Sequence, residues 1–287
     1  MESVQGLKLR LNSVSSTRQI TRSMQMIAST KIQKTLRRMQ QNAPYAERFG
    51  DMARNVARFV RGLRHRYVAP PDAGCSAIIA VSGNRGLCGA YNSNVCREAV
   101  ARIKRMNRDV RCITIGGKMR DHLRRRKYAV EQAFGGASES PFYETAEDAA
   151  VSALELYNKG TVDSVFIIYT QYESALSLLP ITKRILPLSA PGGDPRGRQM
   201  RFEPEADAVL DAVVPLYLSA SVYGAILSAA ACEQSARIMS MDSASKNCAD
   251  MIERLSLRYN RLRQSGITQE LNEIVSGAEA LPATEES

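Results

Sequence analysis

One stretch of the sequence has the composition of a phosphate-binding loop. Residues 82–92 (SGNRGLCGAYN) follow an apolar run of strand length and precede a helical segment, where backbone N–H groups can hold a phosphate. The glycines stand at 83, 86 and 89, however, a spacing that differs from the G-x-G-x-x-G of dinucleotide-binding folds. The Gly117-Lys118 pair is followed by Met119 and does not complete a Walker motif. The spacing favours the alternative, a tight strand-to-helix turn whose glycines allow positive φ and close packing.

The other reactive residue types are scattered along the chain. His65 and His122 are isolated, and no CxxC pair occurs among the cysteines at 75, 88, 96, 112, 232 and 248. We expect reduced, mostly packed thiols, because a disulfide scaffold would be shorter and denser in cysteine. No Ser-His-Asp set and no carboxylate pair with a neighbouring histidine can be assembled. The sequence therefore predicts no active site, no metal and no cofactor.

The longest predicted element is a helix over about residues 206–275, which contains one proline, Pro215, and two glycines, Gly224 and Gly266. Apolar and small residues recur in it alternately three and four positions apart. This 3.5-residue period is typical of a coiled-coil seam. The seam residues are Ile238, Met241, Ser245, Cys248, Ile252, Leu255, Tyr259 and Leu262.

A second long helix is predicted over residues 2–41, and Pro44 marks a place where it could bend. Its seam comprises Val4, Leu7, Leu11, Val14, Thr17, Ile20, Met24 and Ile27. Helical character resumes over residues 45–60, with an apolar side formed by Phe49, Met52, Val56, Phe59 and Val60. Two seams of the same period, at opposite ends of the chain, most simply pack on each other. We expect an antiparallel pair with both chain ends at one tip.

The segment between the two helices is predicted to contain both strands and helices. Strands are predicted over 75–82, 110–115, 163–172 and 176–186, the last interrupted at Pro180, and helices over 90–106, 118–127 and 141–158. This order is typical of a mainly parallel sheet. The predicted fold is an antiparallel coiled coil with an inserted Rossmann-like α/β domain. The boundaries are 1–68 for the first helix, 74–190 for the α/β domain, 191–205 for a linker and 206–287 for the second helix.

The positive charge is concentrated at the start of the chain. The net charge is +10, and residues 1–66 carry fourteen Lys and Arg against three acids. Basic residues on the outer face of the first helix include Lys31, Lys34, Arg37 and Arg38. An acidic partner is implied, and nucleic acid, an anionic membrane and an acidic protein surface all fit. No run of 18 apolar residues occurs, so we expect no membrane span, and basic residues interrupt any signal-peptide core.

Polar residues gather near the end of the second helix, where the seam partner could run out. Arg263, Gln264, Thr268, Gln269 and Glu270 lie within two turns. Two interpretations remain open: a solvated helix end, or a contact surface whose weak hydrogen bonds form and break.

Four segments resemble the γ subunits of F-type ATP synthases. They are TRSMQMIASTK (21–31), SGNRGLCGAYN (82–92), EQSARIMSMDSASKN (233–247) and YNRLRQSGITQELNEIVSGA (259–278). The amino-acid sequence of the third segment resembles that of mitochondrial and alphaproteobacterial members. No inserted cysteine pair of the chloroplast redox type is present.

This resemblance implies a non-catalytic shaft inside a ring of three α and three β subunits, turned by the membrane c ring. It implies that the shaft contacts the catalytic subunits through Met24, Arg237, Arg263, Gln264, Thr268, Gln269 and Glu270. It also implies that Phe202, Glu203 and Glu205 face the c ring and the small central-stalk subunit (δ or ε). The expected location is the matrix side of the mitochondrial inner membrane or, alternatively, the cytoplasmic face of a bacterial plasma membrane. The competing hypothesis is a basic coiled-coil protein that binds nucleic acid through its charged helix.

Overall fold

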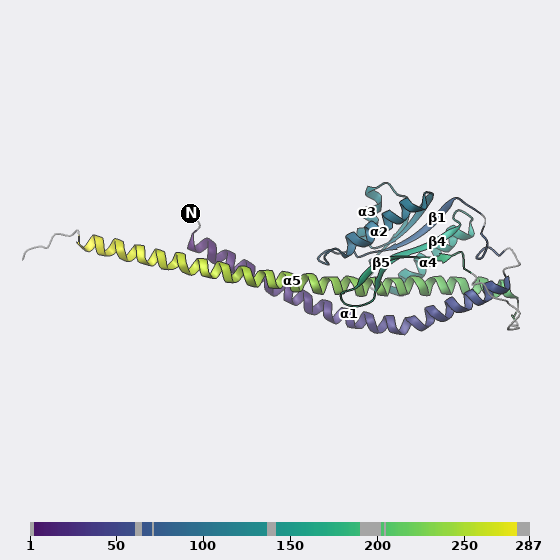
Figure 1. The fold of residues 1–287 in the computed structure, drawn as a ribbon, viewed down its shortest axis with the longest axis horizontal. Coiled ribbons are helices and arrows are strands. Elements are labelled where there is room, and N and C mark those ends of the chain that lie inside the picture. The colour runs from purple at the N-terminus through teal and green to yellow at the C-terminus, as the bar shows by residue number, and fades with distance from the viewer. Residues whose placement is uncertain are drawn as a thin grey trace, which may run out of the picture. The chain divides into compact units, whose positions relative to one another are not determined.

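The computed structural model describes residues 3–60, 65–70, 72–136, 142–189, 202–203 and 205–279. It contains two compact units, one built from residues 1–26 and 240–287, the other from residues 27–239. Two long helices, α1 (Val4–Val60) and α5 (Ala206–Glu279), each contribute to both units (Figure 1). Most of the expected linker, 191–205, lies outside the described residues.

The larger unit is organised around a five-stranded sheet in the order β3-β2-β1-β4-β5. Its strands are β1 (Cys75–Val81), β2 (Asp109–Ile115), β3 (Val130–Phe134), β4 (Ser164–Tyr172) and β5 (Leu178–Leu186). The first four strands are parallel, and β5 pairs antiparallel with β4. The chain winds outward from β1 in both directions, which confirms the Rossmann-like topology predicted from the sequence.

Helices cover both faces of the sheet, as the buried character of every residue of β1 requires. One face carries α2 (Tyr91–Met106) and α3 (Gly117–Arg125), whose Val95, Ile103 and Leu123 pack against Ile78. The other face carries α4 (Phe142–Asn158) and α5 (Figure 1). The sheet is therefore enclosed, with α5 as part of its core and not as an appendage.

The later part of α1 runs antiparallel to the first part of α5. The Asn42 side chain donates to the Ala220 carbonyl at 3.5 Å, whereas a Cβ on Gly50, two turns further along α1, would lie 3.0 Å from the Tyr217 ring. Ala53 and Val56 then join the same core as Leu218. Small residues at these contacts allow the two helix backbones to approach closely.

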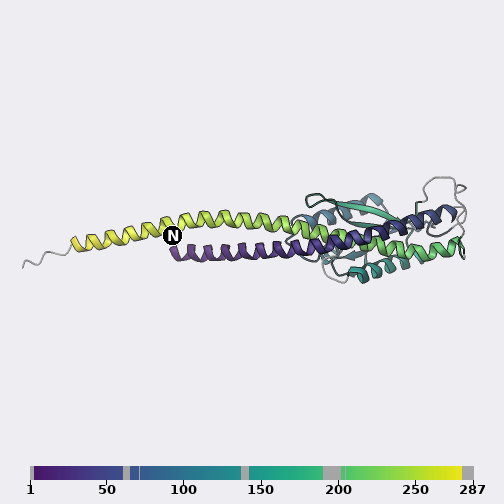
Figure 2. The same cartoon turned by 90° about the horizontal axis from the view of Figure 1, so that it is seen from below.

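The smaller unit is a helix pair that ends before α5 does. The first turns of α1 lie beside α5 in both views (Figures 1 and 2). Leu7 of α1 is fully buried, and Met241 and Leu255 of α5 are 5% and 9% exposed. The predicted seam of α5 is confirmed, because each member from Met241 to Leu262 is buried or half-buried. Beyond Leu262 only Gly266 is partly covered among the residues to 277.

The predicted seam of α1 is correct as far as Val14 and wrong beyond it. Ile20, Met24 and Ile27 are 54%, 36% and 57% exposed. Thr17 is also exposed. The covered positions are instead Arg18, Thr21, Gln25 and Ala28. These residues keep the three-and-four spacing but are polar or small. The spacing of apolar residues therefore predicts a seam that is displaced by one residue from the observed one.

Four smaller findings concern single elements. Met52 is 45% exposed, because Ala53 and Val56 form the buried side there; the side chains of Phe59 and Val60 lie outside the described residues. The helix α1 continues through Pro44. The strand β3 was not predicted, since Glu131 and Gln132 interrupt its apolar residues. The strand β5 is continuous through Pro180, which an edge strand tolerates because one side of its backbone needs no partner.

Among the described residues, α5 is also long and apolar enough to cross a membrane, although the sequence has no run of 18 apolar residues. Its most apolar 18-residue window has a mean hydropathy of 1.6, and 61% of that window is buried in the fold. Leu218, Val222 and Ile226 from this part of the helix belong to the core under the sheet. The apolar composition is therefore accounted for by packing.

We predict that Leu255→Asp unfolds the smaller unit far more readily than Leu257→Asp. Leu255 is 9% exposed and Leu257 is 57% exposed, so only the first substitution buries a charge in the seam. The expected loss is about 4 kcal/mol for Leu255→Asp and within about 0.5 kcal/mol for its neighbour. Thermal unfolding of the full chain, followed by helical circular dichroism, measures both. Equal effects would show that the seam is misplaced.

Candidate functional site

The glycine-rich loop after β1 is folded back on itself. The N–H of Gly83 donates to the Asn92 side-chain oxygen at 2.9 Å, and the Asn92 amide donates to the Arg85 carbonyl at 3.1 Å. Leu87 and Gly89 take φ values of +60° and +54°. The loop is therefore a tight turn in which the Gly83 N–H, a donor that a phosphate could use, is already bonded.

A buried carboxylate of α5 occupies the space beside this turn. Glu233 is fully buried, and a Cβ on Gly83 would lie 2.9 Å from its carboxylate. Arg237 pairs with Glu233 at 2.7 Å and also donates to the Gly86 carbonyl at 3.3 Å. The Glu233 carboxylate fills space against the Gly83 backbone that a phosphate would need. The geometry therefore supports the tight-turn interpretation.

The same helix is bonded to the end of β4. Ser228 accepts from the N–H of Tyr172 at 2.8 Å and donates to the Thr170 carbonyl at 3.1 Å. One turn further along α5, Cys232 donates to the same carbonyl at 3.4 Å, and Ser235 donates to the Ala175 carbonyl at 2.7 Å. In open α/β sheets, ligands bind at the carboxyl ends of the strands where the winding reverses, here between β1 and β4. In this chain α5 fills that place. We call the contact of residues 228–237 with the ends of β1 and β4 the switch-point contact.

The N-terminus of α3 is a second place where an anion could bind, but side chains of this chain already accept hydrogen bonds from its backbone N–H groups. The Asn84 side-chain oxygen accepts from the Gly117 N–H at 2.6 Å, and the Ser82 hydroxyl accepts from the Met119 N–H at 2.9 Å. These two side chains use donors that a phosphate would need. Among the described residues, no group of three or more His, Cys, Asp or Glu side chains could hold a metal ion.

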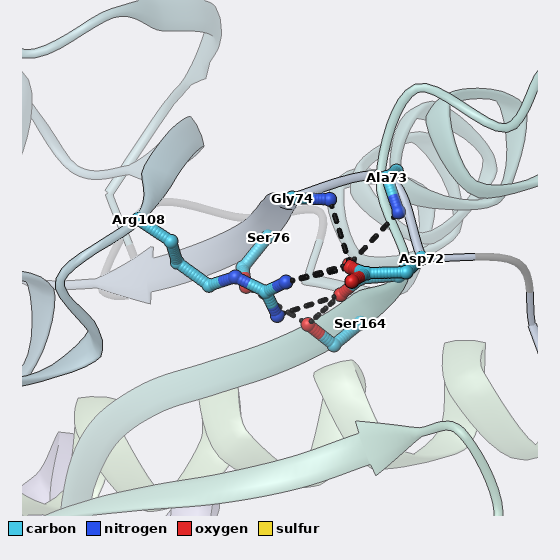
Figure 3. A network of polar contacts seen from close by, with 7 residues as sticks. Asp72, Ala73, Gly74, Ser76, Arg108 and Ser164 are labelled. Carbon is cyan, nitrogen blue, oxygen red and sulfur yellow. Dashed lines mark hydrogen bonds and ion pairs between the residues drawn. The ribbon is translucent and has the colours of Figure 1, made fainter.

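A polar network lies at the opposite end of the strands, where β1, β2 and β4 begin (Figure 3). Arg108 donates to both carboxylate oxygens of Asp163, at 3.0 and 2.9 Å, and to Asp72 at 3.1 Å. Ser164 donates to Asp163 at 2.8 Å and is 2.8 Å from the Ser76 hydroxyl. The N–H of Gly74, with the Arg108 guanidinium, holds the pKa of Asp72 below its ordinary value. The network ties together the starts of β1 and β4 and the entry to β2.

The predicted polar cluster lies on the part of α5 that extends beyond the helix pair. Arg263, Gln264, Thr268, Gln269 and Glu270 are all exposed. Thr268 donates to the Gln264 carbonyl at 2.9 Å, and Gln269 to Glu273 at 3.0 Å, so these bonds remain within one helix. The same turns expose an apolar stripe of Ile267, Leu271, Ile274 and Val275, which are 49%, 56%, 67% and 55% exposed.

Comparison with known proteins identifies the family. A model described as ATP synthase matches residues 3–281. The ATP synthase gamma chain of Pelotomaculum thermopropionicum is 37% identical over 283 residues, covering 98% of this chain and all of the relative. That of Alkaliphilus metalliredigens is 36% identical over 285 residues, covering 97% and 98%. The chain belongs to the ATP synthase gamma chain family.

Two solved structures share the fold. A chain of the Euglena gracilis mitochondrial ATP synthase (OSCP/F1/c-ring, rotational state 3) gives a TM-score of 0.68 at 19% identity, covering 99% of each chain. A chain of the Tetrahymena thermophila mitochondrial central stalk and c ring gives 0.60 at 23% identity, covering 79% of this chain and 99% of the other. The curated gamma chains named above come from bacteria, so the mitochondrial or alphaproteobacterial type stays a prediction.

The residues that the gamma chain resemblance singles out are distributed over both units. Met24 is exposed on α1 in the smaller unit. Arg237 belongs to the larger unit, where its side chain is 15% exposed and is bonded to Glu233. Phe202 and Glu203 line a cavity of about 620 Å³ together with Arg48, Asn55 and others on α1 and α5, and Glu205 is exposed. Contacts of all these residues with other subunits stay predictions.

Sequence reasoning missed the switch-point contact and the Arg108 network. Glu233 carried a signal, because it is an acid that directly follows the apolar run from Ala229 to Cys232. An acid in such a run is expected to be buried with a partner. Asp163 and Arg108 lie 55 positions apart, and only the sheet order brings them together.

We predict that the thiols of the switch-point contact are unreactive in the folded chain. Burial raises the pKa of Cys232 to about 12, and burial together with the Glu233 carboxylate raises the pKa of Cys88. Since the thiolate is the reactive form, iodoacetamide at neutral pH is expected to modify only Cys248, the one cysteine that is not buried. In urea all six should react. Rapid labelling of Cys88 or Cys232 without denaturant would contradict the packing.

Proposed function

We propose that this chain is the central rotor shaft of an F-type ATP synthase. It couples proton-driven rotation of the membrane c ring to conformational changes, and hence to ATP synthesis, at the catalytic β subunits. Membership of the gamma chain family supports this proposal. The structural observation that carries it is the single, uncovered end of α5 after Leu262.

That helix end has the surface of a segment with a partner. A lone helix of its length is marginally stable in water, and its apolar stripe gains nothing there. The stripe at 267, 271, 274 and 275 repeats on one side of the helix, with polar residues such as Gln264 and Thr268 around it. A surrounding apolar surface with polar groups at its margin would complement this helix end. We assign that surface to the α and β subunits.

Asymmetry explains how a shaft without an active site drives catalysis. In each orientation, a rod that lacks three-fold symmetry makes different contacts with chemically identical neighbours. It therefore biases their open and closed states differently, through differences in contact free energy. Each contact must be weak, since a strong one would trap one orientation. The exposed residues Lys31, Lys34 and Arg37 fit acidic loops of the β subunits.

We assign the cavity lined by Phe202 and Glu203, with the nearby Glu205, to contacts with the c ring and the small central-stalk subunit (δ or ε). The chain then belongs to the peripheral F1 sector on a membrane. The bacterial origin of the similar gamma chains favours the cytoplasmic face of a bacterial plasma membrane over the mitochondrial matrix. The competing nucleic-acid hypothesis has little support, because no stacking aromatic residue lies among the basic residues from Lys31 to Arg38.

We predict that the chain co-purifies with ATP synthase α and β subunits and hydrolyses no ATP when isolated. The switch point, where an α/β fold would bind a nucleotide, is filled by α5 and Glu233. Tagged chain should recover the ATPase subunits from cells, whereas the purified chain should show no turnover. Recovery of DNA in their place, with binding that falls steeply as salt rises, would support the competing hypothesis.

We predict that Met24→Lys lowers proton pumping more than it lowers ATP hydrolysis in the assembled enzyme. Met24 is 36% exposed on α1, so a lysine there reaches the surroundings. A new ion pair with a β carboxylate would deepen one rotational position by about 1 kcal/mol. Met26→Lys is the control, because Met26 is 71% exposed on another side of the helix. A strictly proportional fall of pumping and hydrolysis would contradict a coupling role for Met24.

A further inference from the structure

The switch-point contact differs from ordinary helix packing. Along most of the larger unit, α5 packs in the core through apolar residues such as Leu218, Val222 and Ile226. The hydrophobic contribution of such contacts is non-directional. At the carboxyl ends of β1 and β4 the contact consists instead of directional bonds from two sides of the helix. Ser228, Cys232 and Ser235 hold β4 and the turn after it, and Glu233 and Arg237 hold the loop after β1.

We propose that this contact is the joint that makes the α/β domain and α5 turn as one body, with Glu233 as its main positioning residue. The inference rests on the rotor function proposed above. Torque that enters through the α/β domain must pass to a helix whose other contacts with the domain are largely apolar. A buried charged side chain that projects from the helix into the opposing loop prevents the helix from rolling or sliding against the sheet.

The geometry around Gly83 shows how closely Glu233 fits. An added Cβ on Gly83 would be 2.9 Å from the Glu233 carboxylate and 3.2 Å from the Asn92 side-chain oxygen. The carboxylate therefore lies directly against the loop backbone. Arg237 neutralises it at 2.7 Å and reaches the Gly86 carbonyl, so one ion pair joins the helix to both halves of the turn. The Tyr91 ring, also buried, belongs to one apolar cluster with Cys88 and Cys232.

The Arg108 network provides a matched control at the amino ends of the strands of the same sheet. It joins Asp72, Asp163 and Ser164 through bonds of similar length, and its bonds to these residues do not involve α5. Its loss is expected to weaken the α/β domain without loosening the hold of the domain on α5. Asp163→Asn and Glu233→Gln are isosteric, and each removes one carboxylate charge from an arginine partner.

The experiment compares the complete ATP synthase carrying Glu233→Gln with one carrying Asp163→Asn, in sealed membrane vesicles. ATP hydrolysis, ATP-driven proton pumping and the melting temperature of each purified chain are measured. We expect Glu233→Gln to keep hydrolysis and to lose pumping per ATP hydrolysed, because the helix turns without carrying the domain. Asp163→Asn should keep both activities in the wild-type ratio, with a lowered melting temperature.

If Glu233→Gln keeps the wild-type ratio of proton pumping to ATP hydrolysis, the proposed joint is wrong. It is also wrong if both variants lose this ratio to the same extent. If Glu233→Gln does not assemble, Ser235→Ala decides, since it removes a single hydrogen bond to the Ala175 carbonyl. A reduced ratio then supports the joint and an unchanged ratio overturns it. Failure of the rotor function is distinguishable, because in that case the wild-type chain would not restore coupled pumping to an enzyme that lacks its gamma chain.

Discussion

The buried pair of Glu233 and Arg237, set against the backbone of Gly83, is the constraint on which the larger unit depends. It explains three features at once: the glycine in the loop, the acid at the end of an apolar run of α5, and the use of the switch point by the chain's own helix. A buried charge is tolerated only when it is paired, so Glu233, Arg237 and the loop must keep their relative positions. An α/β fold that would elsewhere hold a nucleotide holds a helix here.

The two units are held together by different interactions. The larger unit encloses its sheet, and α5 supplies Leu218, Val222 and Ile226 to the core. The smaller unit is held by a narrow seam that ends near Leu262, after which α5 continues uncovered. Strong internal bonds where two parts must move together, and exposed weakly bonding residues where contacts must change, are what a rotating shaft requires.

The sequence was most informative where burial and apolar character coincide. The α5 seam and the strand β1 were predicted correctly because nearly every covered position there is apolar or small. Prediction failed where buried positions are polar: Arg18, Thr21 and Gln25 continue the α1 seam while Ile20 faces outward. The joint at Glu233 and the Arg108–Asp163 pair depend on contacts between distant segments, which local periodicity does not encode. The exposed cluster at the end of α5 was located correctly, whereas its partners were inferred from the family resemblance alone.

The most direct test of the account is the rotation of the α/β domain itself, observed in single molecules. A bead can be attached to α3 through Arg125→Cys, an exposed position, in a complex of the chain with immobilised α and β subunits. When ATP is added, the bead should turn in one direction, and its revolutions should stay proportional to the ATP consumed as viscous load increases. A bead that stands still or slips while ATP is consumed would contradict the claim that the domain and α5 move as one body.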